Sequence, residues 1–343
     1  MKKILLILSI VFFSVNKVNL VEAKCSFNCP KFVKNEALVL WDKSSYDTKW
    51  CTPRRSPSMK KYSKSVTRHR TPHPENGFEI FLKENASTIN FAISNPKQFD
   101  FKKYKSQILE LATSNSFSYL DWTRNGGGSP AFASALIIKS ISYSYALIEE
   151  YEKFTEKEAQ KVRDWVVGIE KNIHKKGNSL DHDIAVATTH ILWGAASKDD
   201  TFFKKGQKGM LSFLSKTKRN GKIADDVGYN NKIMHHLVQG AEVLELNGVK
   251  IYSKIFNNLT LHDIIESHAK NILSVPERSI MRSEGYGKHI AWVPIYLKRF
   301  KNNKTSNAVI ELRQTLREKY RDRKPFFGRH IAINTSCYYG NEI

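Results

Sequence analysis

Apolar residues recur at helical spacing, every three or four positions, along most of the chain from about residue 78 onward. Ser129-Pro130 supplies an N-cap and a proline for the first helical position, and an apolar stripe follows as far as Ile148. Thr155 and Glu158 form a capping box in front of a second apolar stripe. Strand-like alternation is nearly absent, so the pattern predicts an all-α protein.

The same periodicity predicts further helices in the rest of the chain, separated by turns such as Gly177-Asn178 and Asn220-Gly221. Amphipathic helices joined by short turns favour helical hairpins packed side by side, as a bundle or a closed ring. The sequence has no fixed-period repeat, which disfavours a regular solenoid. The further helices are predicted over residues 181–192, 199–214, 230–246, 261–273, 288–300 and 305–322.

Residues 24–77 lack this periodicity and are rich in Lys, Arg, Ser and Pro. We interpret them as an irregular N-terminal arm in front of one large domain, residues 78–343. The chain has four cysteines, and an even number favours two disulfides, with three possible pairings. A bridge from the last cysteine to one of the others would join the two ends of the chain. The alternative, a metal site among the first three, has no histidine pair at suitable spacing. The cysteines are Cys25, Cys29, Cys51 and Cys337.

The first residues have the layout of a secretory signal peptide. Met1-Lys2-Lys3 is basic, Ile4 to Val15 is mostly apolar, and Val21-Glu22-Ala23 suits cleavage after Ala23. The apolar run is shorter than the roughly 20 residues that span a bilayer. No later segment meets that requirement by inspection, so we expect residues 1–23 to be removed and the protein to be periplasmic or secreted, without stable membrane insertion.

The chain is strongly basic, with 55 Lys and Arg against 33 Asp and Glu and a formal net charge of +22. A basic surface concentrates anionic ligands and speeds their capture. For an exported protein the abundant polyanions are acidic polysaccharides and lipid headgroups, so nucleic acid is not the expected partner. We therefore expect an acidic polysaccharide to be bound by a monomeric protein.

Two groups of polar residues are candidates for chemistry. Tyr229, Lys232 and His236 are spaced by three and four residues, so they share one face of a helix and combine proton transfer with anion binding. Asp181-His182 stands where a turn leads into a helix, and a histidine there could serve as an acid or a base. The plainer alternatives are an ordinary polar helix face and a helix cap next to a surface histidine.

Other candidates have weaker patterns. His182, His235 and His236 do not have the spacing of a known zinc motif, so neither a metal nor another cofactor is expected. Asp225-Asp226 could be glycosidase carboxylates, but adjacent acids at a turn more often cap a helix. Aromatic faces suit sugar rings, and Trp292 is the preferred candidate because its segment interrupts a helical stretch. The other aromatic candidates are Trp122, Trp193 and Tyr286.

Taken in order, several segments over roughly residues 80–300 resemble the alginate lyase family of polysaccharide lyases. The resemblance implies an incomplete α/α toroid of helical hairpins, here with an irregular, cysteine-bearing N-terminal arm, and a cleft for the polymer. It also implies β-elimination at a uronate. The similar segments are the helix at 129–151, Asn178 to His182 with the following helix, the turn at 220–226, and Ala291 to Tyr296.

The family's functional positions map onto this chain with several changes. The family histidine falls on His182, and the asparagine before it is replaced by Asp181. The catalytic arginine falls on Tyr229, a second arginine on Lys232 and the catalytic tyrosine on His236. The resemblance thus implies His182, Tyr229 and His236 as catalytic residues. It implies Asp181, Lys232, Trp292 and Tyr296 as substrate-binding residues.

Three functions follow as hypotheses. The first is a lyase that cleaves an alginate-like polysaccharide. The second is a non-catalytic protein that binds acidic exopolysaccharide through the same basic surface. The third, an α/α-toroid glycoside hydrolase, requires two carboxylates in one cleft.

Overall fold

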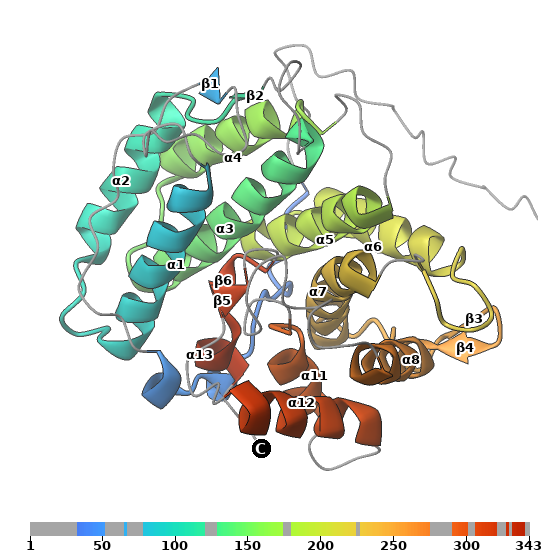
Figure 1. Cartoon of the computed structure of the whole chain (residues 1–343). Helices are drawn as coiled ribbons and strands as arrows, with labels where there is room; N and C mark the ends of the chain where they lie inside the picture. The colour runs from blue at the N-terminus through green and yellow to red at the C-terminus, as the bar shows by residue number, and fades with distance from the viewer. Residues whose placement is uncertain are drawn as a thin grey trace, which may run out of the picture. The chain divides into compact units, whose positions relative to one another are not determined.

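The computed structural model of the 343-residue chain describes ten stretches, and the elements within them are mostly helical (Figure 1). The predicted signal peptide, Cys25 and Cys29 lie outside the described residues. The described residues are 33–51, 65–66, 78–120, 129–173, 180–223, 227–274, 290–300, 306–320, 327–328 and 331–339.

The helices alternate between an inner and an outer position, as successive helical hairpins. Each inner helix contacts the next inner one, in the order α1, α3, α5, α7 and α11, and each is followed by an outer helix, α2, α4, α6, α8 or α12 (Figure 1). The inner helices are α1 (Phe78–Ser94), α3 (Pro130–Tyr151), α5 (Leu180–Ser197), α7 (Val227–Leu246) and α11 (Val293–Phe300). The outer helices are α2 (Phe101–Thr113), α4 (Glu156–Glu170), α6 (Asp200–Leu214), α8 (Leu261–Ser274) and α12 (Asn307–Tyr320).

Burial explains which helices are inside. Nearly every side chain of α3 is buried, whereas α6 buries one face and exposes the other. A helix that is apolar all round needs neighbours on every side, and an amphipathic helix can cover the outside. The capping box at the start of α4 forms as predicted, with the Glu158 side chain and the Thr155 side chain each bonded to the other's backbone N–H.

The helices α5 and α6 approach closely because glycines lie at their interface. A Cβ atom placed on Gly206 would lie 2.5 Å from the backbone nitrogen of Ile191 and 2.6 Å from the carbonyl oxygen of Ala187. A Cβ on Gly194 would lie 2.4 Å from the backbone nitrogen of Phe203. Because the contacts run in opposite directions along the two helices, α5 and α6 are antiparallel.

The helices α3, α5 and α7 run parallel to one another. Between α3 and α5, Phe132 meets His182 and, further along both helices, the Thr189 hydroxyl donates to the Ala135 carbonyl. Between α3 and α7, Phe132 meets His236, and Lys139 meets Gln239 further along. The N-terminal ends of the three helices therefore lie at the same end of the ring.

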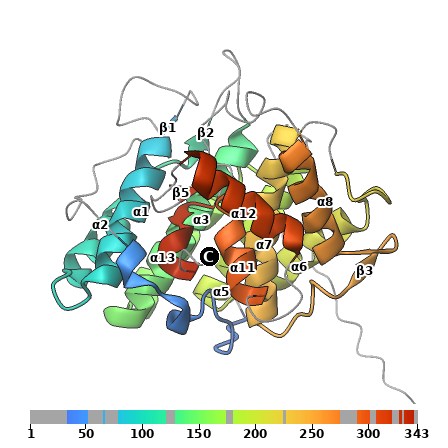
Figure 2. The same cartoon turned by 60° about the horizontal axis from the view of Figure 1, so that its bottom comes forward.

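The C-terminal segment packs inside the ring, beside α1 and α11. Every residue of α13 (Thr335–Tyr339) is buried, and β6 (Ile333–Asn334) pairs antiparallel with β5 (Phe327–Gly328). Both cartoon views place α13 between α1 and α11 (Figure 2), and β6 contacts α1.

The disulfide that joins the chain ends is Cys51–Cys337. It connects the described part of the arm, with the short 3-10 helices η1 (Lys43–Ser45) and η2 (Thr48–Trp50), to α13. The predicted bridge from Cys337 to an N-terminal cysteine is confirmed. The boundary at residue 77 stays a prediction, although residues 33–51 already belong to the same compact unit as the helices.

Two of the predicted helices have different ends in the structure. The second predicted helix ends at Glu170, before the turn at 177, and α11 begins at Val293 instead of residue 288. Short strands that the sequence did not predict are also present. The parallel pair is β1 (Ser65–Val66) with β2 (Tyr119–Leu120), and the hairpin is β3 (Ile255–Phe256) with β4 (Leu259–Thr260).

We expected no segment after residue 23 to be long and apolar enough to span a membrane, and this expectation was wrong. Within the described residues α3 is long and apolar enough to do so. However, 94% of its most apolar stretch is buried inside the protein, as in the core helix of a water-soluble domain. This burial accounts for its composition without a membrane.

Candidate functional site

Phe132, in the first turn of α3, brings two of the predicted catalytic residues together. Its ring centroid lies 5.4 Å from that of His182 on α5 and 5.8 Å from that of His236 on α7. His182 is partly exposed, whereas His236 has no exposed surface. The two histidines therefore contact the same aromatic ring, and His182 is the more exposed of the two.

A buried lysine lies beneath His236. Lys139 on α3 has no exposed surface, and its Nζ lies 2.6 Å from His236 Nδ1 and 2.9 Å from Gln239 Oε1. Gln239 Nε2 lies 2.8 Å from the Ile331 carbonyl, which can only accept a hydrogen bond. This contact fixes the orientation of the amide, so Oε1 faces Lys139 and accepts a hydrogen bond from it.

Burial determines the charge state of this lysine. Because the ammonium form would lose its hydration, the pKa of Lys139 is lowered well below the ordinary lysine value. The same network reaches Tyr143, to whose hydroxyl Gln239 Nε2 also donates, and burial raises the Tyr143 pKa well above the ordinary value. Sequence reasoning missed Lys139, although a lysine within the apolar run of residues 131–148 was a usable signal.

Tyr229 and Lys232 lie at the N-terminal end of α7, the end of the ring at which His182 begins α5. Tyr229 is exposed, and the ammonium of Lys232 lies 4.6 Å from the centroid of its ring, a cation–π arrangement. Asp181, next to His182, is buried in the first turn of α5. The contact between Tyr229 and Lys232 confirms that these two side chains share one face of α7. Because α5 and α7 run parallel, both residues lie at the end of the ring that carries His182.

Trp292 and Tyr296 occupy a different place, in the packing among α7, α8 and α11. Trp292 is fully buried, and its indole N–H donates to Asn231 Oδ1 at 2.9 Å. The Tyr296 hydroxyl lies 3.0 Å from His262 Nδ1, and burial raises the pKa of Tyr296 to about 12. Neither ring is available to stack on a sugar in this structure, because the segment begins a core helix instead of forming an exposed loop.

Of the other candidate residues, some are buried in the core and the rest lie outside the described residues. Trp193 is buried, with its ring centroid 5.3 Å from that of Tyr145, and His235 Nδ1 lies 2.8 Å from the Asn231 carbonyl. Within the described ranges no cluster of three His, Cys, Asp or Glu side chains is arranged to hold a metal ion. Trp122, Asp225, Asp226 and Tyr286 lie outside the described residues.

The electrostatics at this end of the ring favour anions. A helix N-terminus carries the equivalent of about half a positive charge and unpaired N–H groups. Three parallel helices present their N-termini here together with the Lys232 ammonium, while the carboxyl groups of Asp181 and Asp183 in the first turn of α5 oppose part of this positive charge. The arrangement can attract a carboxylate and offers His182 and the Tyr229 hydroxyl for proton transfer.

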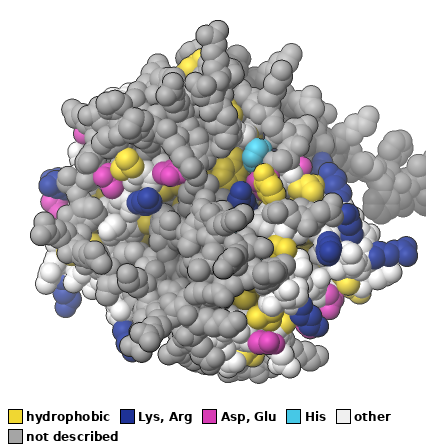
Figure 3. All heavy atoms as spheres, viewed as in Figure 1, with side chains coloured by type: hydrophobic (Ala, Val, Ile, Leu, Met, Phe, Trp, Pro, Cys, Tyr) yellow, Lys and Arg dark blue, Asp and Glu magenta, His cyan; other side chains and the backbone are white. Residues whose placement is uncertain are grey.

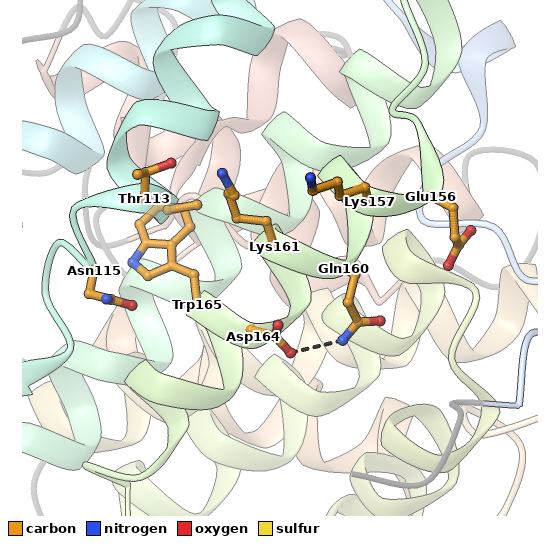
Figure 4. Close-up of a pocket in the computed structure, with 9 residues that line it drawn as sticks. Thr113, Asn115, Glu156, Lys157, Gln160, Lys161, Asp164 and Trp165 are labelled. Carbon is orange, nitrogen blue, oxygen red and sulfur yellow. Dashed lines mark hydrogen bonds between the residues drawn. The ribbon is translucent and has the colours of Figure 1, made fainter. Parts of the chain in front are cut away.

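A surface pocket of about 720 Å³ lies elsewhere, between the end of α2 and the first half of α4 (Figure 4). Lys157, Lys161, Gln160 and Asp164 line it, and Gln160 donates to Asp164 at 2.8 Å. It is next to the C-terminal end of α3, and a helix of 22 residues is about 33 Å long. The pocket is therefore distant from Phe132 and the two histidines.

Comparison with known proteins supports the fold. No protein-family model and no curated protein matches the chain. Alginate lyase A1-III from Sphingomonas species A1 is similar in structure, with a TM-score of 0.66 and 13% identity over 90% of this chain and 97% of that one.

Two variants of that enzyme, both complexed with a tetrasaccharide, are also similar in structure. A Tyr-to-Phe variant has a TM-score of 0.62 and 13% identity, over 84% of this chain and 86% of that one. A His-to-Ala variant has a TM-score of 0.62 and 13% identity, over 89% and 97%. The chain therefore has the incomplete α/α toroid fold of alginate lyase A1-III, as the sequence resemblance predicted.

Proposed function

We propose that this protein is a polysaccharide lyase that cleaves an acidic, uronate-containing polysaccharide by β-elimination. The observation that carries the proposal is the meeting of His182 and His236 at Phe132, within the fold of an alginate lyase. The partner of the solved variants, a tetrasaccharide, supports a saccharide ligand for this fold.

The reaction makes three demands on the site. The uronate carboxylate must be neutralised, a base must remove the C5 proton, and an acid must protonate the departing 4-oxygen. Neutralising the carboxylate also stabilises the enolate-like intermediate, and electrostatic stabilisation of this kind is usually the largest single contribution to catalysis. As the C4–O4 bond breaks, a double bond forms between C4 and C5.

We assign the base and the acid to side chains that a polymer could reach from solvent. His182 is the partly exposed imidazole, so it takes the C5 proton, and the exposed Tyr229 hydroxyl gives a proton to the 4-oxygen. Lys232 and the helix N-termini neutralise the carboxylate. His236 is buried and hydrogen-bonded to Lys139, so it acts on the site through Phe132, whose ring also contacts His182.

The decisive experiment is incubation of the purified mature chain with alginate, pectate and a glycosaminoglycan. We expect ultraviolet absorbance from an unsaturated uronate product on at least one polymer. His182→Ala should lower kcat by about 10²–10⁴-fold, as expected for loss of a general acid or base. Lys102→Ala, on the exposed face of α2, is the control and should retain full activity. Absence of product on all three polymers would reject the lyase.

One observation favours the second candidate, a non-catalytic protein that binds acidic exopolysaccharide. His236, which stands at the family's catalytic tyrosine position, has no exposed surface. Such a protein would bind the polymer in a salt-sensitive manner, and binding would survive both His182→Ala and His236→Ala. Binding without product formation by the native chain would establish this alternative.

We also propose that the protein is exported. Residues 1–23 have the layout of a signal peptide, and disulfides such as Cys51–Cys337 persist in oxidising compartments. N-terminal sequencing of protein recovered from the periplasm or medium should begin at Lys24. Recovery of a chain that retains Met1, with Cys51 reduced, would contradict export.

A further inference from the structure

The outer helix α6 presents a basic stripe to the solvent. Its buried face holds Phe202, Phe203, Gly206, Met210, Phe213 and Leu214. Lys204, Lys205 and Lys208 are exposed on the opposite face. Between residues 201 and 222 the sequence has seven basic residues and no acidic one, so the stripe continues into the turn that follows the helix. Figure 3 shows Lys and Arg side chains gathered at this edge of the molecule.

Only part of this charge is neutralised by neighbouring acids. Lys204 pairs with Asp200 at 2.5 Å, and Lys205 pairs with Glu170 at 2.8 Å. Five more basic side chains follow along the chain, and four of them form no ion pair with any residue in the stretches that the structure describes and are exposed. These four, which we name the basic ridge, are Lys208, Lys216, Arg219 and Lys222.

The turn that carries most of the ridge is held in place. The Asn257 side chain, at the tip of the β3–β4 hairpin, donates to the carbonyls of Ser215 at 2.8 Å and Thr217 at 2.7 Å. The Ser267 hydroxyl on α8 donates to the Asn220 carbonyl at 3.1 Å. A backbone fixed in this way presents its cations without a large ordering cost on binding.

The ridge lies at the end of the ring that carries the candidate site. The contacts of Gly194 with Phe203, Gly206 with Ile191, and Gly209 with Ala187 show that α6 runs toward the N-terminal turn of α5. The turn after α6 then leads to the start of α7, which bears Tyr229. The turn at 215–223 and His182 therefore lie at the same end of the ring.

From these observations we infer that the basic ridge is a second binding surface, outside the catalytic site, for the carboxylates of a long acidic polysaccharide. The choice of polysaccharide as the occupant rests on the proposed function. A fixed row of unpaired cations attracts a polyanion through release of its counterions, which makes the binding strongly salt-dependent. A short oligosaccharide that fills the catalytic site alone would not reach the ridge.

The test compares two variants with the same change in net charge. The ridge variant combines Lys208→Gln, Lys216→Gln, Arg219→Gln and Lys222→Gln. The control variant combines Lys83→Gln, Lys97→Gln, Lys102→Gln and Lys103→Gln, which are exposed positions on and between α1 and α2. Affinity for long-chain alginate is measured over a range of salt concentrations, with turnover of a tetrasaccharide measured in parallel.

We expect the ridge variant to lose at least about ten-fold in affinity for the polymer at low salt and to show a shallower salt dependence. The control variant should lose less than about three-fold, because its cations are not in the row. Turnover of the tetrasaccharide should be unchanged in both. As a second probe, Asn257→Ala should weaken polymer binding without changing the net charge.

Equal losses of affinity in the ridge and control variants would overturn the inference, because they would reflect total charge alone. It would also be overturned if the ridge variant lost more affinity for duplex DNA or anionic lipid vesicles than for alginate. If the native chain releases no product but still binds alginate through the ridge, the lyase fails and the inference stands. If product forms but the ridge variant binds alginate as tightly as the native chain, the inference fails and the lyase stands.

Discussion

Lys139 Nζ lies 2.6 Å from His236 Nδ1, with both side chains closed off from solvent between α3 and α7. Burial lowers the pKa of Lys139 well below its ordinary value, so the folded protein holds this amine without a proton over a range in which the unfolded chain binds one. The free energy of unfolding should therefore rise with pH between the lowered pKa and about 10.4, the value in the unfolded chain.

The variant Lys139→Met removes this contribution. Between the lowered folded pKa of Lys139 and its unfolded value, the stability of the native protein should rise with pH relative to that of the variant, by up to about 1.4 kcal/mol per pH unit. Urea unfolding at several pH values measures the difference. The exposed Lys102→Met is the control, and its profile should parallel that of the native protein. A parallel profile for Lys139→Met would show that the buried amine is protonated in the folded state.

Glu170 should make the protein sensitive to acid. Burial alone would raise its pKa, but the hydrogen bond and charge of His190, at 2.7 Å, and the charge of Lys205 outweigh burial and lower the pKa to about 2. A carboxylate with a lowered folded pKa contributes stability above its unfolded value, about 4.3, and loses it as the pH falls toward the folded value.

Glu170→Gln should therefore destabilise the protein at pH 6, and the difference from the native protein should shrink between about pH 4.3 and 2. Thermal unfolding across this pH range measures it. Glu266→Gln breaks an exposed pair with Lys270 and should cost less than about 1 kcal/mol at any pH. A difference between Glu170→Gln and the native protein that did not change with pH would contradict the lowered pKa.

The Cys51–Cys337 disulfide should be a large contributor to stability because it closes a loop with a sequence separation of 286 residues. Replacing both cysteines by serine should cost about 2–5 kcal/mol. Chemical denaturation with and without reductant measures this cost, and reductant should have little further effect on the double variant. If Cys25→Ser with Cys29→Ser removed as much stability, the link between the arm and α13 would not be the main contribution.

Two glycines in helices should respond to alanine with opposite signs. At Gly206 the new methyl group would lie within 2.6 Å of backbone atoms of α5, so Gly206→Ala should destabilise by about 2 kcal/mol or more. At Gly168 the nearest atom would be 3.9 Å away, so Gly168→Ala should stabilise by up to about 1 kcal/mol through helix propensity. Melting temperatures of the two variants test the close packing of α5 on α6.

Local patterns were enough to predict most of the helices. The N-cap at Ser129, the capping box at Thr155 and the apolar stripe of α6 depend on residues within a few positions of one another. Hydrogen bonds and helical periodicity act over that range, so the sequence shows them directly. The fold itself was predicted through the family resemblance, because no local signal distinguishes a ring of hairpins from a bundle.

The contacts that form the candidate site depend on how distant helices pack. Lys139 and His236 are 97 positions apart, and they meet because α3 and α7 run parallel inside the ring. The pairing of Cys51 with Cys337 and the burial of Trp292 against Asn231 also join distant parts of the chain. The local sequence pattern therefore did not reveal either contact. Burial and long-range pairing belong to the packed ring as a whole, since each helix gains its inner or outer position only from its neighbours.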